Sequence, residues 1–235
     1  MSEAELDVWQ YWEGPMPGYV ELCVETVRRH YPAARLLDRA GFEELWTADR
    51  DVPIEHLGAP HRSDFVRAYV LRHHNGLWLD SDFVLLRRID ELCELPASIT
   101  FAGYRVDDGD FTNNLMYSRP GDPVLEHLYS RICDHLRSGA LIRWLEIGSL
   151  ALSPAISAHG DVVWEMSADL VCPIPWHEFH RFEQPGHAGE LASADRCGVM
   201  LANNSASAGL RAKPRDAVLE DNSLLADLLR CALAA

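Results

Sequence analysis

The chain has 235 residues, 48% hydrophobic and 24% charged, enough to bury one sizeable core, so we expect a single domain over residues 1–235. Its formal net charge of −15 excludes ordinary binding to nucleic acid or to anionic membranes, because both carry negative charge. No apolar stretch reaches the roughly 18 residues of a membrane span, which leaves peripheral contact as the one form of membrane association open to it. The six scattered cysteines and the polar start of the chain predict a cytoplasmic protein with reduced thiols.

The first part of the chain alternates strand and helix patterns. Residues 8–12 are apolar and aromatic and predict a strand, and a helix pattern follows over residues 19–30 after a loop rich in Gly and Pro. Residues 35–37 predict a second strand and residues 41–46 a second helix. This alternation is typical of α/β proteins.

The next helix and strand lead into the most informative part of the sequence. Ser63 is a good N-cap for a helix that runs to about His74, and Asn75-Gly76 is the signal that ends this helix. Residues 77–79 then predict a buried strand, and a strand so soon after a helix indicates a βαβ unit with a parallel sheet. Asp80 therefore lies at the carboxyl end of that strand, where ligands bind in open α/β sheets.

The rest of the chain is less regular. Strands are predicted at residues 99–104 and 115–117, and helices at residues 123–136 and 223–234. After residue 164 prolines, aromatic residues and histidines are mixed without a period. The predicted fold class is α/β with a mostly parallel, Rossmann-like central sheet.

Asp80 and Asp82 form a D-x-D pair. In an extended segment both carboxylates point to the same side, and their apolar neighbours make two unpaired charges costly there. A divalent cation that bridges to a diphosphate removes this cost, and oxygen ligands favour Mg²⁺ or Mn²⁺. The alternative is an acidic turn with two solvated aspartates, which the motif alone does not exclude.

Asp64 and Arg67 lie at positions i and i+3 of the helix before that strand. A carboxylate and a guanidinium on one helix face suit the hydroxyl groups of a sugar. The alternative is a surface ion pair that contributes only about 0.2–0.5 kcal/mol.

Two stretches resemble a known family. The segment SDFVR from Ser63, followed by HNGLWLDSDF from His74, resembles the sugar-binding DXD region of glycosyltransferase family 32 and of capsular polysaccharide synthesis proteins. WQYWEGPMPGYVELCVETVRRH (residues 9–30) and FTNNLMYSRPGDP (residues 111–123) are similar to parts of the capsular-synthesis proteins. A related pattern occurs in the glucosyltransferase domains of large bacterial cytotoxins.

This resemblance implies a GT-A fold, with a nucleotide-sugar-binding half at about residues 1–120 and an acceptor-side, partly helical part at about 121–235. It also implies a retaining transfer of a sugar from a UDP- or GDP-sugar to an acceptor hydroxyl on a polysaccharide, a glycolipid or a small molecule. Mn²⁺ or Mg²⁺ is the implied cofactor.

The resemblance further implies roles at the reacting centre. Asp82 would ligate the metal, and Asp80 would contact the ribose and the hydration shell of the metal. Asn114 would approach the reacting centre, although Asn113-Asn114 also reads as a turn that enters the next strand.

The same resemblance implies binding residues for the two parts of the donor. The residues implied for the donor sugar are Asp64, Arg67 and Asn113. The residues implied for the nucleotide are Trp12, Trp78 and Ser63.

One departure from the family concerns the end of the catalytic region, where the family carries a His. Met200 stands at this position in GVMLANN, and a thioether is a poor Mn²⁺ ligand. Asn203 is the expected substitute ligand, with Asn204 as the alternative; without either, a weakened metal affinity or a loss of activity is the expectation. His177 and His180 are expected to be loop or acceptor-site residues, because a third metal ligand is missing.

Two rival functions fit parts of the sequence. LWLDSDFV also matches a haloacid-dehalogenase-like phosphatase with Asp80 as nucleophile and Asp82 as acid/base, to which Lys213, Asp216 and Glu220 could add further groups. Against this function, the motif normally stands near the start of the phosphatase fold, whereas about a third of this chain precedes Asp80.

The other rival is a catalytically degenerate relative that acts as a partner protein, with the apolar C-terminal helix available for a homodimer contact.

Overall fold

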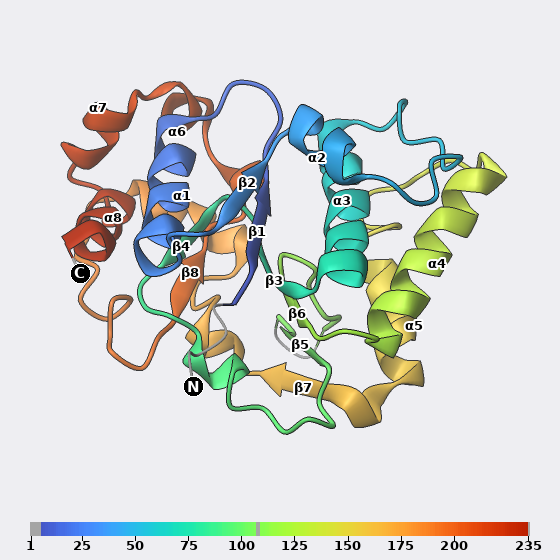
Figure 1. The fold of residues 1–235 in the computed structure, drawn as a ribbon. Helices are drawn as coiled ribbons and strands as arrows, with labels where there is room; N and C mark the ends of the chain where they lie inside the picture. Colours follow the sequence, from blue (N-terminus) through green and yellow to red (C-terminus); the bar gives the residue numbers. More distant parts are fainter. Residues whose placement is uncertain (1–5, 107–108, 235) are drawn as a thin grey trace. The chain divides into compact units, whose positions relative to one another are not determined.

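The computed structural model describes residues 6–106 and 109–234, shown in Figure 1. The chain divides into two compact units that interleave along the sequence. Unit 1 comprises Met1–Glu13, Arg35–Asp80 and Glu91–Met166, and unit 2 comprises Gly14–Ala34, Ser81–Asp90 and Ser167–Ala235. The single domain with halves that meet near residue 120 stays a prediction.

Unit 1 contains a six-stranded sheet in the order β2-β1-β3-β6-β5-β7. Its strands are β1 (Val8–Tyr11), β2 (Arg35–Leu37), β3 (Gly76–Leu79), β5 (Phe101–Tyr104), β6 (Leu115–Ser118) and β7 (Val163–Met166). The pairs β1–β2, β1–β3 and β5–β7 are parallel, whereas β6 runs antiparallel to both β3 and β5. The predicted α/β class with a mostly parallel sheet is confirmed, and the parallel strands β1, β2 and β3 end at one common edge.

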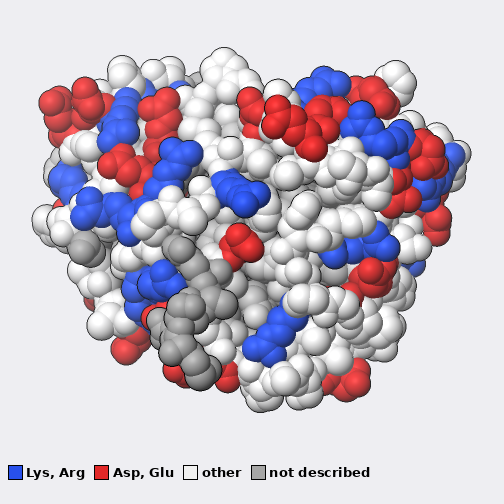
Figure 2. Space-filling view, in the orientation of Figure 1, with Lys and Arg blue, Asp and Glu red and all other residues white. Residues whose placement is uncertain are grey.

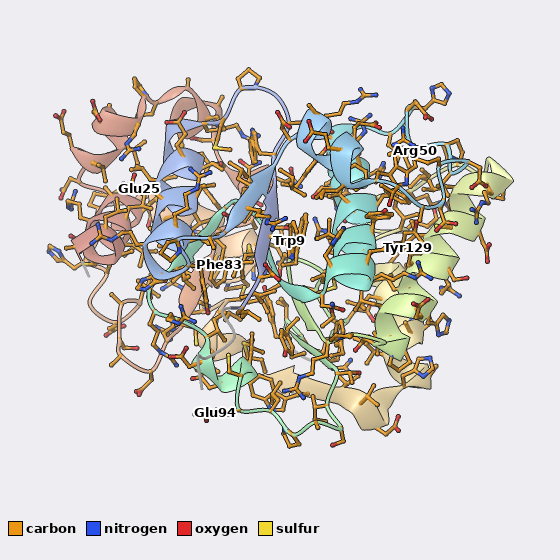
Figure 3. All side chains as sticks on the ribbon, in the orientation of Figure 1. Trp9, Glu25, Arg50, Phe83, Glu94 and Tyr129 are labelled. Atoms are coloured by element: carbon orange, nitrogen blue, oxygen red, sulfur yellow. The ribbon has the colours of Figure 1, made fainter. Side chains whose placement is uncertain are left out.

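The helices of unit 1 pack beside this sheet. They are α2 (Arg39–Leu45), α3 (Ala59–His74), α4 (Pro123–Ser138), α5 (Ser149–Ala158) and the 3₁₀ helix η2 (Gly160–Val162), and η1 (Asp90–Leu92) lies where the chain enters unit 1 from unit 2. Helix α3 contacts β1 and β3, and α4 and α5 follow beyond it (Figure 1). Tyr129 of α4 points toward α3 (Figure 3), where its ring lies 5.8 Å from Phe65. This aromatic core fixes α3 against the sheet.

Unit 2 is built on a two-stranded antiparallel ladder of β4 (Phe83–Leu85) and β8 (Gly198–Met200). Helix α1 (Gly18–His30) packs on β4, and α8 (Leu224–Ala234) contacts both. The remaining elements are η3 (Ala168–Leu170), η4 (Trp176–Glu183), η5 (Asn203–Ser205), α6 (Ala208–Ala212) and α7 (Arg215–Leu219). A Cβ on Gly198 would lie 2.3 Å from the Phe83 ring. Only glycine therefore fits at this position in the pairing of β8 with β4.

The expected start of α3 is wrong. The helix begins at Ala59 after the N-cap Gly58, and Ser63 lies inside it, one turn further on. Pro60 explains the difference, because a proline in the first turn lacks only an N–H that has no partner there. The expected end is confirmed: Asn75 takes a φ of 60° and Gly76 a φ of 99°, a region that favours glycine.

On the face drawn in Figure 2, acidic and basic side chains are interspersed. None of the helices in residues 6–106 and 109–234 is long and apolar enough to cross a membrane.

Candidate functional site

Arg67 is the centre of a polar cluster in unit 1, at the carboxyl end of β3. Its side chain is only 6% exposed, and its Nη2 atom lies 3.1 Å from Asp80 Oδ1 and 3.6 Å from Asp64 Oδ1. Nη1 donates to the Asn113 carbonyl at 2.6 Å, and Nη2 donates to the Ser63 hydroxyl at 3.0 Å. The alternative of a surface ion pair is therefore wrong, because α3 is packed between the sheet and α4 and buries the guanidinium.

Asp64 is held by one further hydrogen bond, from Asn113, which is itself fixed by Ser149. Asp64 Oδ1 accepts a hydrogen bond of 2.7 Å from Asn113 Nδ2, and the Asn113 Oδ1 in turn accepts from the Ser149 hydroxyl at 3.3 Å. Burial raises the pKa of Asp64 above its ordinary value, and the nearby Arg67 and the Asn113 hydrogen bond only partly offset this. The carboxylate is thus fixed in place by donors on one side.

Asp80 is oriented from the strand that precedes it. Trp78 Nε1 donates to Asp80 Oδ1 at 2.7 Å, and the Asp80 backbone N–H donates to the Asn114 carbonyl at 2.8 Å. The Trp78 ring is fully buried, with the Arg67 guanidinium 5.2 Å from its centroid. Trp78 therefore positions the Asp80 carboxylate from within the core. The Asn114 side chain accepts from the Thr112 hydroxyl at 2.9 Å.

The start of helix α5 and its N-cap supply two site neighbours that the sequence patterns did not reveal. Ser149 begins the helix, and a Cβ on Gly148 would lie 2.8 Å from Asn113 Nδ2 and 3.1 Å from Asp64 Oδ1. The signal is weak in the sequence, because Gly148-Ser149 follows a stretch without clear periodicity and belongs to no motif.

Gly148→Ala tests whether this close approach positions the cluster. Because the methyl group would displace the ends of two side chains rather than backbone, we expect a small stability change, within about 1 kcal/mol. If the expected sugar transfer is assayed, displacement of Asp64 and Asn113 should lower its kcat/KM by about ten- to a hundredfold. Gly160→Ala is the matched control, since nothing lies within 4 Å of the position that its added methyl group would take. Equal activity of both variants would contradict a role for the Asp64–Asn113 contact.

The carboxyl end of β1 lies at the same edge of the sheet and carries Trp12. The residues on either side of it are tied down: Glu13 forms a bidentate ion pair with Arg62 Nη1 at 2.7 Å, and the Tyr11 hydroxyl donates to Glu13. Burial alone would raise the pKa of Glu13, but the hydrogen bonds from Tyr11 and Arg62 outweigh it and the pKa is lowered. The network thus joins the end of β1 to α3, one residue before Ser63.

Unit 2 holds Asp82, whose environment is also buried. The residue is 7% exposed, and its Oδ2 accepts a hydrogen bond of 2.5 Å from the Asn203 backbone N–H. The Tyr19 hydroxyl donates to Asn203 Oδ1, and burial together with the Asp82 charge raises the pKa of Tyr19. Met200 is buried in β8, opposite Phe83. Of the two candidate asparagines, Asn203 contacts the Asp82 carboxylate through its backbone N–H, whereas Asn204 is exposed.

The described residues contain no group of three or more His, Cys, Asp or Glu side chains placed to hold a metal ion. Mg²⁺ and Mn²⁺ sites on nucleotides need fewer protein ligands, because one or two carboxylates are completed by phosphate oxygens and water. Asp82 offers carboxylate oxygens of the kind that such an ion prefers, and so does Asp80, two positions earlier in the sequence. His177 and His180 lie in η4 and belong to no such group.

The fold is the α/β fold of GT-A glycosyltransferases. No protein-family model matches the chain, and no curated protein matches it in sequence.

Two solved structures carry this likeness. A glycosyltransferase involved in the glycosylation of the major capsid of PBCV-1 matches with a TM-score of 0.56 and 12% identity, over 87% of this chain and 96% of that chain. The apo structure of WbbM, a bifunctional glycosyltransferase, matches with a TM-score of 0.52 and 12% identity, over 97% of this chain and 49% of that chain. The chain thus spans about half of WbbM. At this identity the likeness establishes the fold, and the chemistry must be argued from the site.

Proposed function

We propose that the protein is a metal-dependent, retaining glycosyltransferase that moves a sugar from a UDP- or GDP-sugar to an acceptor hydroxyl. The observation that carries this proposal is the cluster of Asp64, Arg67, Asp80 and Asn113 at the carboxyl end of β3, in a GT-A fold. Ligands bind at this edge of open α/β sheets. The resemblance of the sequence to glycosyltransferase family 32 and to capsular polysaccharide synthesis proteins supports the same function.

Asp64 and Asn113 are proposed to bind hydroxyl groups of the donor sugar. The Asp64 carboxylate accepts hydrogen bonds, and the donors on one side leave its other oxygen as the natural acceptor for a hydroxyl. Arg67 holds the cluster together and supplies its positive charge. Binding through fixed groups lowers the entropic cost of placing the sugar.

Asp82, Asp80 and Asn203 are proposed to hold Mn²⁺ or Mg²⁺, with Asp82 as the principal ligand. Such an ion would supply positive charge for the leaving diphosphate. The Asn203 backbone N–H orients the Asp82 carboxylate, and Tyr19 orients the Asn203 amide. Asn114 is proposed to lie near the reacting centre, where its amide would stabilise the departing oxygen.

Trp12, Trp78 and Ser63 are proposed to serve the nucleotide. Trp12, at the end of β1, would stack on the base, whereas the buried Trp78 orients Asp80 toward the ribose. Ser63 supports Arg67 through its hydroxyl and its carbonyl.

Thermal unfolding with UDP, GDP and dTDP, each with and without Mn²⁺, tests the function. A nucleotide held at about 100 times its Kd stabilises the native state by about 2.7 kcal/mol, which raises Tm by roughly 5–10 °C for a protein of this size. We expect one nucleotide to give this shift, and only with Mn²⁺.

Each contrary outcome selects another function. Phosphate release from simple monoesters without a nucleotide shift would favour the phosphatase. A nucleotide shift without hydrolysis or transfer of any nucleotide-sugar would favour the degenerate partner protein. The described structure contains no observation that favours either.

A further inference from the structure

Large apolar side chains are exposed in one short segment of unit 1, residues 141–150, which connects α4 to α5 and includes the first two residues of α5. Five large apolar residues of the described chain are exposed, and four of them lie in this segment. They are Leu141 (83% exposed), Trp144 (55%), Leu145 (41%) and Leu150 (49%). Such a concentration is uncommon on a protein surface and marks a place that binds something apolar.

The segment has a defined shape. The Leu145 carbonyl accepts from the backbone N–H groups of Gly148 and Leu150 at 3.0 and 3.1 Å, and Glu146 Oε2 accepts from the Arg143 N–H at 2.7 Å. Leu145 takes a φ of 67°, a left-handed conformation that is unfavourable for a branched, bulky residue. Strain of this kind concentrates in binding segments, where surrounding contacts enforce it.

The same segment is joined to the proposed sugar cluster. It contains Ser149, whose hydroxyl donates to Asn113 Oδ1, and Gly148, on which a Cβ would lie 3.1 Å from Asp64 Oδ1. The Trp144 ring also lies 6.3 Å from the ring of His61, which stands one turn before Asp64 on α3. A molecule that covers the segment would therefore extend to the side of the cluster where the sugar is proposed to bind.

We infer that residues 141–150 bind the acceptor, and that this acceptor carries an alkyl or aryl group next to its reacting hydroxyl. This inference rests on the proposed glycosyltransferase function. Leucine side chains cannot satisfy the hydroxyl groups of an unsubstituted sugar, which would lose hydrogen bonds to water on covering them. An alkyl or aryl group loses none and gains from removal of apolar surface from water. The net charge of −15 opposes the anionic bilayer surface as the occupant.

Binding of alkyl glucosides tests the inference without requiring turnover. Glucosides with methyl to octyl chains, each below its micellar concentration, are titrated into the protein by calorimetry in the presence of the stabilising nucleotide and Mn²⁺. For wild type we expect the affinity to rise about two- to fourfold for each added methylene group. The double variant Leu141→Ser/Trp144→Ala should show a nearly flat series. Trp176→Ala is the matched control, because it removes an exposed Trp of unit 2 (64%), and it should keep the wild-type slope.

Two further readouts separate failure of the inference from failure of the function. Hydrolysis of the nucleotide-sugar by wild type with a flat glucoside series would overturn the inference and leave the glycosyltransferase function standing. A steep series without hydrolysis or transfer of any nucleotide-sugar would overturn the acceptor role together with that function. Sedimentation of wild type, but not of the double variant, with phosphatidylcholine vesicles would assign the segment to a bilayer. A dimer of wild type in light scattering that the double variant does not form would assign it to a second copy. Either result would also overturn the inference.

Discussion

Asp82→Asn is expected to lower kcat for sugar transfer by about 10²–10³-fold, the loss typical of removing one group that stabilises developing charge. Asn keeps an oxygen for the Asn203 N–H, so the hydrogen bond of 2.5 Å survives while the negative charge is lost. Fold and stability should therefore change little. The measurement is kcat for donor hydrolysis and transfer, together with the Mn²⁺-dependent part of the nucleotide Tm shift, which should disappear.

Asp90→Asn is the matched control within unit 2. Its carboxylate is exposed and pairs with Arg88, a contact of small energetic value, so that activity should equal that of wild type. Wild-type kcat in Asp82→Asn would show that Asp82 holds no metal in the reaction. A large loss in both variants would point to a general effect of charge instead.

Arg67→Met is expected to destabilise the protein by about 3 kcal/mol, because it removes a buried cation that is paired with two partly buried carboxylates. Asp64 and Asp80 would each lose a partner within 3.6 Å. The pKa of Asp64 is already raised by burial, and Arg67 is the main group that lowers it, so the variant should raise it further.

The sign of the pH dependence follows from this pKa. A carboxyl whose pKa is higher in the folded than in the unfolded state gives its full stability below the unfolded pKa of about 3.9 and loses it as the pH rises through the folded pKa. The deficit of Arg67→Met relative to wild type should therefore be largest at pH 7 and shrink toward pH 4. Urea unfolding at both pH values measures it.

Two controls accompany Arg67→Met. Asp64→Asn in the Arg67→Met background removes the titrating group and should abolish most of the change with pH. Arg72→Met, on the same helix, removes a more exposed pair with Glu126 and should cost less than about 1 kcal/mol. A cost this small for Arg67→Met would contradict its central position in the cluster.

The sequence by itself predicted the elements near the site and the residues at its centre. The alternation of strand and helix and the stop at Asn75-Gly76 are local features, and they placed Asp80 at the end of β3. The spacing of Asp64 and Arg67 put both on one face of a helix, where the structure finds them 3.6 Å apart.

Local sequence signals did not decide where helix α3 begins, because two residues could start it. Ser63 has the chemistry of an N-cap, but Pro60 begins the helix a turn earlier, and the Ser63 hydroxyl instead accepts from Arg67. The strands β4 and β8 were not predicted, because each has only three residues and gains its stability from the other, more than 100 positions away.

What only the tertiary structure decided is which distant groups meet. Burial of Arg67, the approach of Gly148 to Asp64 and the hydrogen bond from Asn203 to Asp82 each join segments from 46 to 121 positions apart. Periodicity and capping act within a few turns or residues and therefore fix elements in the sequence. Long-range hydrogen bonds and the burial of charge depend on how those elements pack, and no local pattern encodes them.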